Sequence, residues 1–412
     1  MSASCVAQED VQIKIKYHTE KAQNYLDKEK ALSGYYSVDK KGVTMYASPQ
    51  DKKAGKAEFS IRWDQIENFN NLMKFYSSKS MLDLYKQNVF QEMPVTEQLL
   101  ARKALPSLKI AIDPGHIAND FIIGDLEKKH LKIKGDSLNG IKDSIEIAEG
   151  ILTYATAILL KEKLEKEGAV VFLTRAADKS AFGKTFEQWK KDDLKKAVDS
   201  LAKIGELKPS QKQYFLSKNV KDRDIFRVIF RDLELAKRIE LINNFKPDLT
   251  VVIHFNVDET NLDWKKCSDK NYNMSFVAGA FMKSDLSNKE KRFEFLRLLI
   301  TNDLERSIEL SSAVVQSFEK VLNVKTAGIL DATYLKQGCL PTATSGVYCR
   351  NLQLPRYIHS PIVYGETLYQ DNLEECKLLN SEVDKTKNKR IQQVAEAYFK
   401  GILDYITNTS KK

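Results

Sequence analysis

The chain has 412 residues, which is enough for a sizeable buried core and for two domains, because single cores rarely grow beyond about 250–300 residues. Hydrophobic residues make up 42% and charged residues 29%, which is ordinary for a folded globular protein, and no apolar run reaches the ~18 residues of a membrane-spanning helix. The net charge of +9 suits an anionic partner, but lysines are interspersed with acidic residues almost everywhere, which favours a well-solvated basic surface.

The first hundred residues predict a separate unit. After a polar, helical opening, GYYSVDKKGVTMYA (34–47) places two strand-forming runs around an Asp-Lys-Lys-Gly turn, and KAEFSIRW (56–63) offers a third strand. A helical segment over about 64–85 and a linker with Pro94 and Pro106 follow. We expect a small α+β accessory domain over residues 1–105, and nothing in its sequence suggests a catalytic site.

From Leu108 onward, strand and helix patterns alternate, which predicts an α/β domain with a mixed, mostly parallel sheet flanked by helices. We expect this domain over residues 106–412. Its predicted elements are the strand SLKIAID (107–113), the helix SIEIAEGILTYATAILLKEKLEKEG (144–168), the strand AVVFLTR (169–175), the helix ELAKRIELINNFKPD (234–248) and the strand LTVVIHFN (249–256). Helical insertions are expected at about 119–142, at 179–226 and within 257–359.

Two of these strands have a histidine at or near their carboxyl ends. His116 closes the motif Asp-Pro-Gly-His, and His254 lies in LTVVIHFN, although the chain has only five histidines. Ligands of open α/β sheets sit beyond the carboxyl ends of the strands. Either histidine alone is more often a hydrogen-bonded structural residue, but the pair points to a metal site.

A catalytic zinc site commonly has two histidines and one carboxylate. Glu146 and Glu149 both lie at or near the start of the helix that follows the first histidine strand, so either carboxylate could reach the site. Glu146 could equally be a solvated residue that favours the helix dipole. Helical periodicity does not separate the two.

Four blocks in this order resemble the zinc-dependent N-acetylmuramoyl-L-alanine amidases that cut peptidoglycan. The blocks are DPGH (113–116), EGAVVFLTRAAD (167–178), ELAKRIELINNFKPDLTVVIHFN (234–256) and PIVYGETLYQDN (361–372). Aligned on the shared LTR strand, the resemblance implies one catalytic Zn²⁺ held by His116, Glu149 and His254, with Glu146 left out.

The resemblance also implies a catalytic glutamate with an asparagine six residues later, and Glu366 and Asn372 stand in that relation. From the residues alone, 361–364 is a short strand and Glu366 lies just past its end. The implied reaction is hydrolysis of the amide between N-acetylmuramic acid and the L-alanine of the stem peptide, with Glu366 moving the proton. The last helix, 388–406, resembles the one that closes the family's domain.

The chain departs from the family pattern beside His116, His254 and Glu366. Ile117-Ala118 replaces glycines after the first histidine, Phe255-Asn256-Val257 follows the second, and Thr367-Leu368-Tyr369 follows the catalytic glutamate. We expect these changes to alter the shape of the substrate crevice more than they alter metal binding. The insertion at 179–226 is either a helical hairpin packed on the domain's flank or a cap over the crevice.

Two alternatives stay open at this point. One is a peptidoglycan-binding protein with an amidase-like fold and no activity, and the other is a zinc peptidase that cuts a different amide bond, although a carboxypeptidase-like His-x-x-Glu does not follow His116. Peptidoglycan is the expected partner, and an activator protein is a further candidate. Nucleic acid is not expected, because the lysines show no aromatic interleaving.

The expected location is the periplasm or cell envelope. The opening MSASCVAQED shows no export signal, and a lipid anchor on Cys5 is one alternative. Cys339 and Cys349 are either a disulfide of an oxidising compartment or two free thiols.

Overall fold

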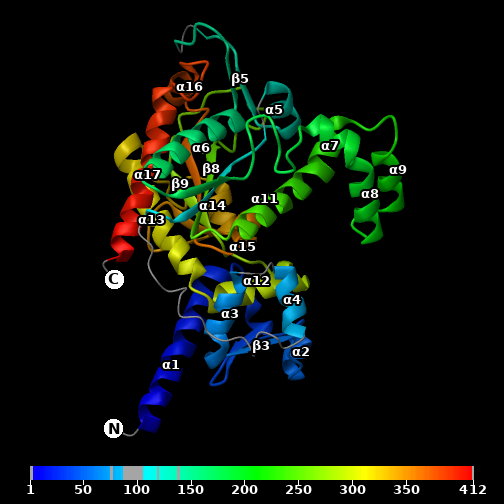
Figure 1. The fold of residues 1–412 in the computed structure, drawn as a ribbon, viewed down its shortest axis with the longest axis vertical. Helices are drawn as coiled ribbons and strands as arrows, with labels where there is room; N and C mark the ends of the chain where they lie inside the picture. The colour runs from blue at the N-terminus through cyan, green and yellow to red at the C-terminus, as the bar shows by residue number, and fades with distance from the viewer. Residues whose placement is uncertain (1–2, 75–77, 87–104, 118–119, 137–139, 411–412) are drawn as a thin grey trace.

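A mixed seven-stranded sheet forms the centre of the computed structural model, which describes residues 3–74, 78–86, 105–117, 120–136 and 140–410 (Figure 1). In spatial order its strands are β10 (Cys339–Pro341), β11 (Val347–Arg350), β9 (Met274–Val277), β12 (Ile362–Tyr369), β8 (Leu249–Asn256), β4 (Lys109–Pro114) and β7 (Val170–Leu173). Four of the neighbouring pairs are parallel, and the pairs β10–β11 and β12–β9 are antiparallel. The predicted fold class is confirmed.

Helices cover both faces of this sheet, which explains why the central strands β4 and β8 contain uninterrupted apolar runs, at 110–112 and 251–253. Along β4, Ile110 and Ile112 belong to the large core on one face, whereas Ala111 belongs to a smaller core on the other. The first face packs against α6 (Glu149–Lys166), α13 (Asp303–Leu322) and α17 (Lys389–Ser410), and the second against α11 (Arg231–Phe245) and α15 (Gln353–Tyr357). Leu335 of α14 (Thr333–Gly338) packs with Phe276 of β9 and Tyr348 of β11, and Leu379 of α16 (Leu373–Asn380) belongs to the large core.

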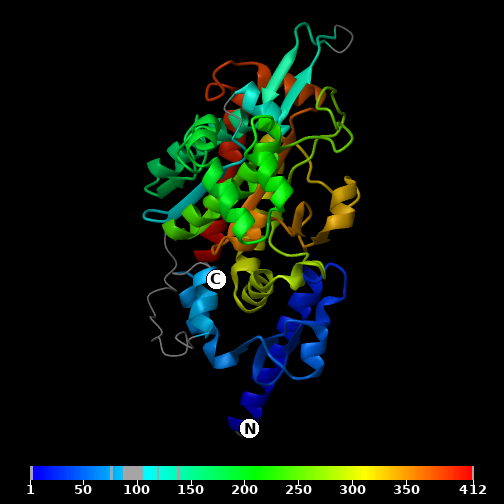
Figure 2. The ribbon, with the colours of Figure 1, turned by 90° about the vertical axis from the view of Figure 1, so that its right-hand side faces the viewer.

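The N-terminal unit is a small α+β assembly, as predicted. Its antiparallel sheet has the order β1 (Tyr36–Val38), β2 (Gly42–Met45), β3 (Phe59–Arg62), and its helices are α1 (Ala3–Lys21), α2 (Pro49–Lys53), α3 (Ile66–Met73) and α4 (Ser78–Lys86). Helix α12 (Lys289–Ile300) lies against it (Figures 1 and 2). The ring of Phe293 on α12 is 5.5 Å from that of Phe59 and 5.7 Å from that of Phe69. The two units therefore share one hydrophobic core, and a boundary at residue 105 stays a prediction.

The expected helical insertion at 179–226 forms an arm that projects to one side of the sheet (Figure 1). It contains α7 (Phe186–Asp192), α8 (Leu194–Lys203), α9 (Pro209–Phe215) and α10 (Asp222–Ile225). Aromatic rings such as Phe186, Trp189 and Phe230 give the arm a core of its own, which extends to Ile123 and Leu126 of α5 (Phe121–Glu127). This arrangement agrees with packing on the flank of the domain.

The insertion expected at 119–142 is only partly helical. After α5, the strand β5 (His130–Ile133) pairs antiparallel with β6 (Ile145–Ala148). The predicted helix over 144–168 is wrong in its first five residues, because α6 begins at Glu149. The apolar residues of β6 also fit the spacing of the helix that follows, and four residues are too few to distinguish strand alternation from helical spacing.

The cysteines with described side chains, Cys267, Cys339, Cys349 and Cys376, are all free thiols. Cys339 is paired across the strands with Arg350 and not with Cys349, so the expected disulfide alternative is wrong for this structure. Cys5 lies outside the residues whose side chains are described, and Pro94 of the expected linker is outside the described residues as well. Within the described part of the chain, no helix is both long and apolar enough to cross a membrane.

Candidate metal centre

The Asp-Pro-Gly-His motif forms a tight turn at the carboxyl end of β4. The Gly115 N–H donates to the Ile253 carbonyl at 2.9 Å, and His116 follows with a φ of 60°, a left-handed conformation that costs a non-glycine residue of order 1–3 kcal/mol. A Cβ at Gly115 would overlap the imidazole of His254. Glycine is therefore required for close approach of the two histidines.

A buried network of charged side chains around Arg238 stabilises this strained turn. Arg238 of α11 donates to the carbonyls of Pro114 at 2.8 Å and His116 at 2.9 Å, and its charge is balanced by Asp113 at 3.1 Å and Glu234 at 2.7 Å. Buried charges persist only when they are paired and hydrogen-bonded. The network therefore fixes the backbone that carries the first histidine.

His254 and Glu366 come from neighbouring parallel strands and lie side by side in register. Residues paired in this way point to the same face of the sheet. Tyr364, two residues before Glu366, stacks on the His254 ring with centroids 4.7 Å apart and an interplanar angle of 10°. Glu366, expected just past the end of a short strand, lies inside β12, which continues to Tyr369.

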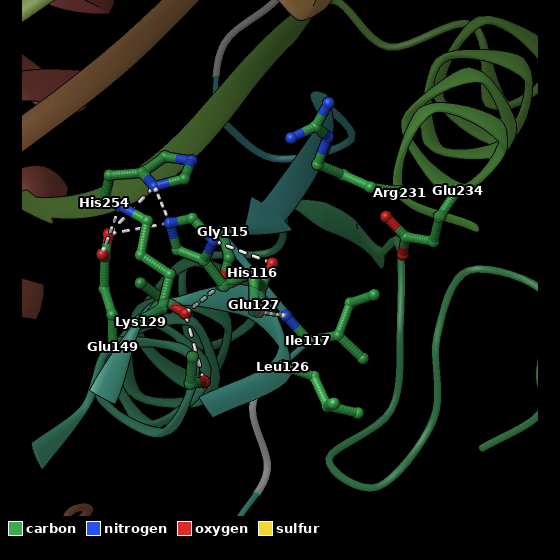
Figure 3. Close-up of polar contacts among 12 residues, drawn as sticks. Gly115, His116, Ile117, Leu126, Glu127, Lys129, Glu149, Arg231, Glu234 and His254 are labelled. Carbon is green, nitrogen blue, oxygen red and sulfur yellow. Dashed lines mark hydrogen bonds and ion pairs between the residues drawn. The ribbon is translucent and has the colours of Figure 1, made fainter. Parts of the chain in front are cut away.

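The ligand candidates His116, Glu149 and His254 converge on one point (Figure 3). His116 Nε2 lies 3.1 Å from Glu149 Oε1 and 3.1 Å from His254 Nδ1, and the latter two atoms are also 3.1 Å apart. Glu149 is the first residue of α6 and is fully buried, at the helix end that favours negative charge. The structure thus brings together the three residues that the resemblance selected.

This donor set fits zinc. Two imidazole nitrogens and one carboxylate oxygen are a common ligand set for catalytic zinc, and bond lengths of about 2.0–2.2 Å place tetrahedral ligand atoms roughly 3.3–3.6 Å apart. The three donor atoms, each 3.1 Å from the other two, need to separate only slightly. The alternative ligand Glu146 is exposed on β6, with its carboxylate 3.9 Å from His130 Nε2, and does not belong to this cluster.

Glu127, at the end of α5, orients His116 from the opposite side. Its carboxylate accepts from His116 Nδ1 at 2.9 Å and from the Ile117 N–H at 3.1 Å. Because a carboxylate only accepts, Nδ1 carries the proton and Nε2 presents its lone pair toward Glu149 and His254. Burial would raise the pKa of Glu127, but His116 and the Ile117 N–H together hold it at about 2.

Lys129 places a cation beside the cluster. Its Nζ lies 3.1 Å from Glu149 Oε2, and it lines a cavity of about 220 Å³ together with Glu366 and the loop that follows β8. Burial would lower the pKa of Lys129, but Glu149 and Glu366 raise it. Burial and then the Glu149 charge raise the pKa of Glu366, which favours a carboxyl group able to exchange a proton.

Glu127 and Lys129 were not among the predicted site residues, because both lie in the expected insertion at 119–142. No periodicity or fixed spacing connects them to the Asp-Pro-Gly-His motif. Asn372, the asparagine six residues after Glu366, is the N-cap of α16, where its side chain accepts from the Glu374 and Glu375 N–H groups. It therefore has a structural role in this chain.

Comparison with known proteins identifies the family to which the chain is similar. The model of the N-acetylmuramoyl-L-alanine amidase family matches residues 110–404, which is more than half of the chain. The comparison with curated proteins gives no match.

Three similar solved structures were aligned, and each alignment covers 73% of this chain. The CwlD amidase from Clostridioides difficile, solved in complex with the GerS lipoprotein, is 18% identical over 100% of its chain, with a TM-score of 0.40. The amidase AmiC2 of Nostoc punctiforme is 15% identical over 97% of its chain, with a TM-score of 0.37. The catalytic domain of CwlV from Bacillus (Paenibacillus) polymyxa var. colistinus is 15% identical over 98% of its chain, with a TM-score of 0.37.

Proposed function

The chain belongs to the N-acetylmuramoyl-L-alanine amidase family and hydrolyses peptidoglycan amide bonds, and we propose that it does so with one zinc ion held by His116, Glu149 and His254. The observation that carries the zinc proposal is the mutual 3.1 Å separation of the three donor atoms. The bond cut is the amide between the lactyl group of N-acetylmuramic acid and the L-alanine of the stem peptide.

The residues divide the chemistry between them. When bound, zinc supplies a Lewis acid that polarises a carbonyl group and activates water near neutral pH. Glu366 accepts a proton from the attacking water and delivers it to the departing nitrogen, a role that its raised pKa and its place on the face of His254 support. Glu127 keeps His116 in the required tautomer and orientation.

We further propose that the enzyme works in the periplasm or cell envelope, because its substrate is there. A lipid anchor on Cys5 would be one way to keep it at the membrane surface. An activator protein is a proposed partner, since the arm of α7–α10 reaches well beyond what the chemistry needs (Figure 1).

Digestion of purified sacculi tests this function. Product analysis by mass spectrometry should find free stem peptides that begin with L-alanine, whereas disaccharide-peptide products would place the cleaved bond elsewhere. The Glu366→Gln variant is the matched control and should bind sacculi and zinc without releasing peptides. If the unmodified, zinc-loaded protein binds sacculi and releases no peptide, the non-catalytic alternative is correct.

A further inference from the structure

The two oxygens of the Glu149 carboxylate have different surroundings. Oε1 accepts from the Phe255 N–H at 3.2 Å and faces the two histidine nitrogens at 3.1 Å. Oε2 is directed to Lys129, whose Nζ lies 3.1 Å away. One oxygen is thus held toward the metal position and the other toward a fixed cation (Figure 3).

Backbone hydrogen bonds and an aromatic ring position Lys129 beside Glu149. Lys129 lies between α5 and β5, where its carbonyl accepts from the Glu149 N–H at 3.0 Å and its own N–H donates to Gly124 at 2.7 Å. Its ammonium lies over the ring of Trp264, 4.9 Å from the centroid, and the Trp264 carbonyl accepts from the Lys132 N–H at 2.9 Å. These contacts hold the backbone of Lys129 and place its ammonium between Trp264 and the Glu149 carboxylate.

The Lys129 side chain is 31% exposed, and it lines the same cavity as Glu366. Among the described residues that line this cavity, Lys129 is the cation, while Asp258, Glu259 and Glu366 are the acids. The cation therefore lies between the second oxygen of the carboxylate ligand and the space available to substrate.

We propose that Lys129 is a positioning residue that makes Glu149 a one-oxygen metal ligand and so preserves an open coordination position on the cavity side. This inference rests on the proposed function. A carboxylate binds a metal through one oxygen or through both, and a catalytic zinc site needs a free position for water or substrate. The ion pair with Lys129 opposes rotation of Oε2 toward the metal, because that rotation would separate the ammonium, on a side chain that is only 31% exposed, from its carboxylate partner.

Lys129 should have opposite effects on metal affinity and on turnover. Its positive charge repels the metal and so weakens metal binding, since like charges repel strongly where water is partly excluded. Its hold on Oε2 keeps the site open and so supports turnover. Removing the charge should therefore strengthen metal binding and slow the reaction, a combination that simple disruption of the fold would not produce.

The test compares Lys129→Met, which keeps an unbranched side chain over Trp264 but removes the charge, with Lys129→Arg, which keeps the charge. Visible absorption of the cobalt-substituted protein reports coordination number, because four-coordinate cobalt(II) absorbs more strongly than five-coordinate cobalt(II). We expect weaker absorption and a lower zinc dissociation constant in Lys129→Met, and absorption close to the unmodified protein in Lys129→Arg. On a soluble muropeptide, kcat of Lys129→Met should fall roughly 10- to 100-fold, the usual range for an outer partner of a metal ligand, with KM little changed.

Lys132→Met is the matched control, because Lys132 lies three residues away and pairs at 2.8 Å with the exposed Asp125. It should change neither the spectrum nor the zinc dissociation constant. An unchanged cobalt spectrum in Lys129→Met, or weaker zinc binding by that variant, overturns the inference while the unmodified protein still loads zinc and releases stem peptides. Failure of the proposed function is a different result, in which the unmodified protein does neither. If Lys129→Met does not fold, Lys129→Gln serves the same test.

Discussion

The contact between Glu127 and His116 gives the sharpest test of how the site is built. Glu127→Gln preserves the shape of the side chain but replaces one acceptor oxygen with an NH₂ group. The carboxylate now accepts from two donors, His116 Nδ1 at 2.9 Å and the Ile117 N–H at 3.1 Å. The amide oxygen can serve one donor, and the NH₂ group then faces the other, so at least one hydrogen bond is lost.

The size of the effect follows from the charge and burial of this pair. Hydrogen bonds to charged groups contribute about 1.5–3 kcal/mol, and loss of an outer partner of a metal-ligating histidine typically weakens metal binding about 10- to 100-fold, or roughly 1.4–2.7 kcal/mol. The side chain of Glu127 is only 9% exposed, so water cannot easily replace the lost contact. We therefore expect the zinc dissociation constant to rise by roughly 10- to 100-fold.

Competition with a chromophoric chelator at fixed pH measures this constant. Asp125→Asn is the matched control, because Asp125 lies on the same helix and its exposed carboxylate pairs with His130 and Lys132 and not with His116. Its dissociation constant should match that of the unmodified protein. If Glu127→Gln binds zinc within a factor of about two of the unmodified protein, well below the range for such partners, Glu127 does not orient the histidine.

Three further predictions concern the residues of the site. Glu149→Ala should lose zinc by elemental analysis, whereas Glu146→Ala, whose carboxylate is exposed, should retain it, and the reverse result would refute the ligand assignment. Glu366→Gln should keep zinc and the melting temperature while turnover of a soluble muropeptide falls by roughly 10²–10⁴-fold, and near-normal turnover would remove it from the mechanism. Gly115→Ala should lose zinc because its new methyl group displaces a ligand imidazole, whereas Gly338→Ala, with no atom within 4 Å of its added Cβ, should bind zinc normally.

The strands that carry the histidines could be predicted because burial on both faces leaves a simple signal. β4 and β8 each contain a continuous apolar run, at 110–112 and 251–253, and each is preceded by a proline that interrupts a strand, Pro106 and Pro247. The choice between Glu146 and Glu149 could not be made in this way. It depends on whether residues 145–148 pair with β5, and that pairing partner lies in an insertion with no regular sequence pattern.

Glu127 and Lys129 were beyond sequence reasoning for a related physical reason. Charged residues in a lysine-rich segment are usually solvated, and only the pairing of β5 with β6 and the packing of α5 beside them turn these two toward the metal position. Such tertiary placement leaves no periodicity in the sequence. The resemblance did not supply it either, because the segment lies between the blocks that carry the resemblance.

The unusual residue after the Asp-Pro-Gly-His motif is explained by the same segment. Where the family commonly has glycine, the Ile117 N–H donates to Glu127, and the Ile117 side chain is buried in the core shared by α5 and the arm, beside residues such as Phe226. Glycine would keep the hydrogen bond but would lose roughly 1.5–3 kcal/mol of apolar burial. The departure from the family pattern thus ties the histidine turn to the insertion that supports it, and the two features are best understood as one adaptation of the site.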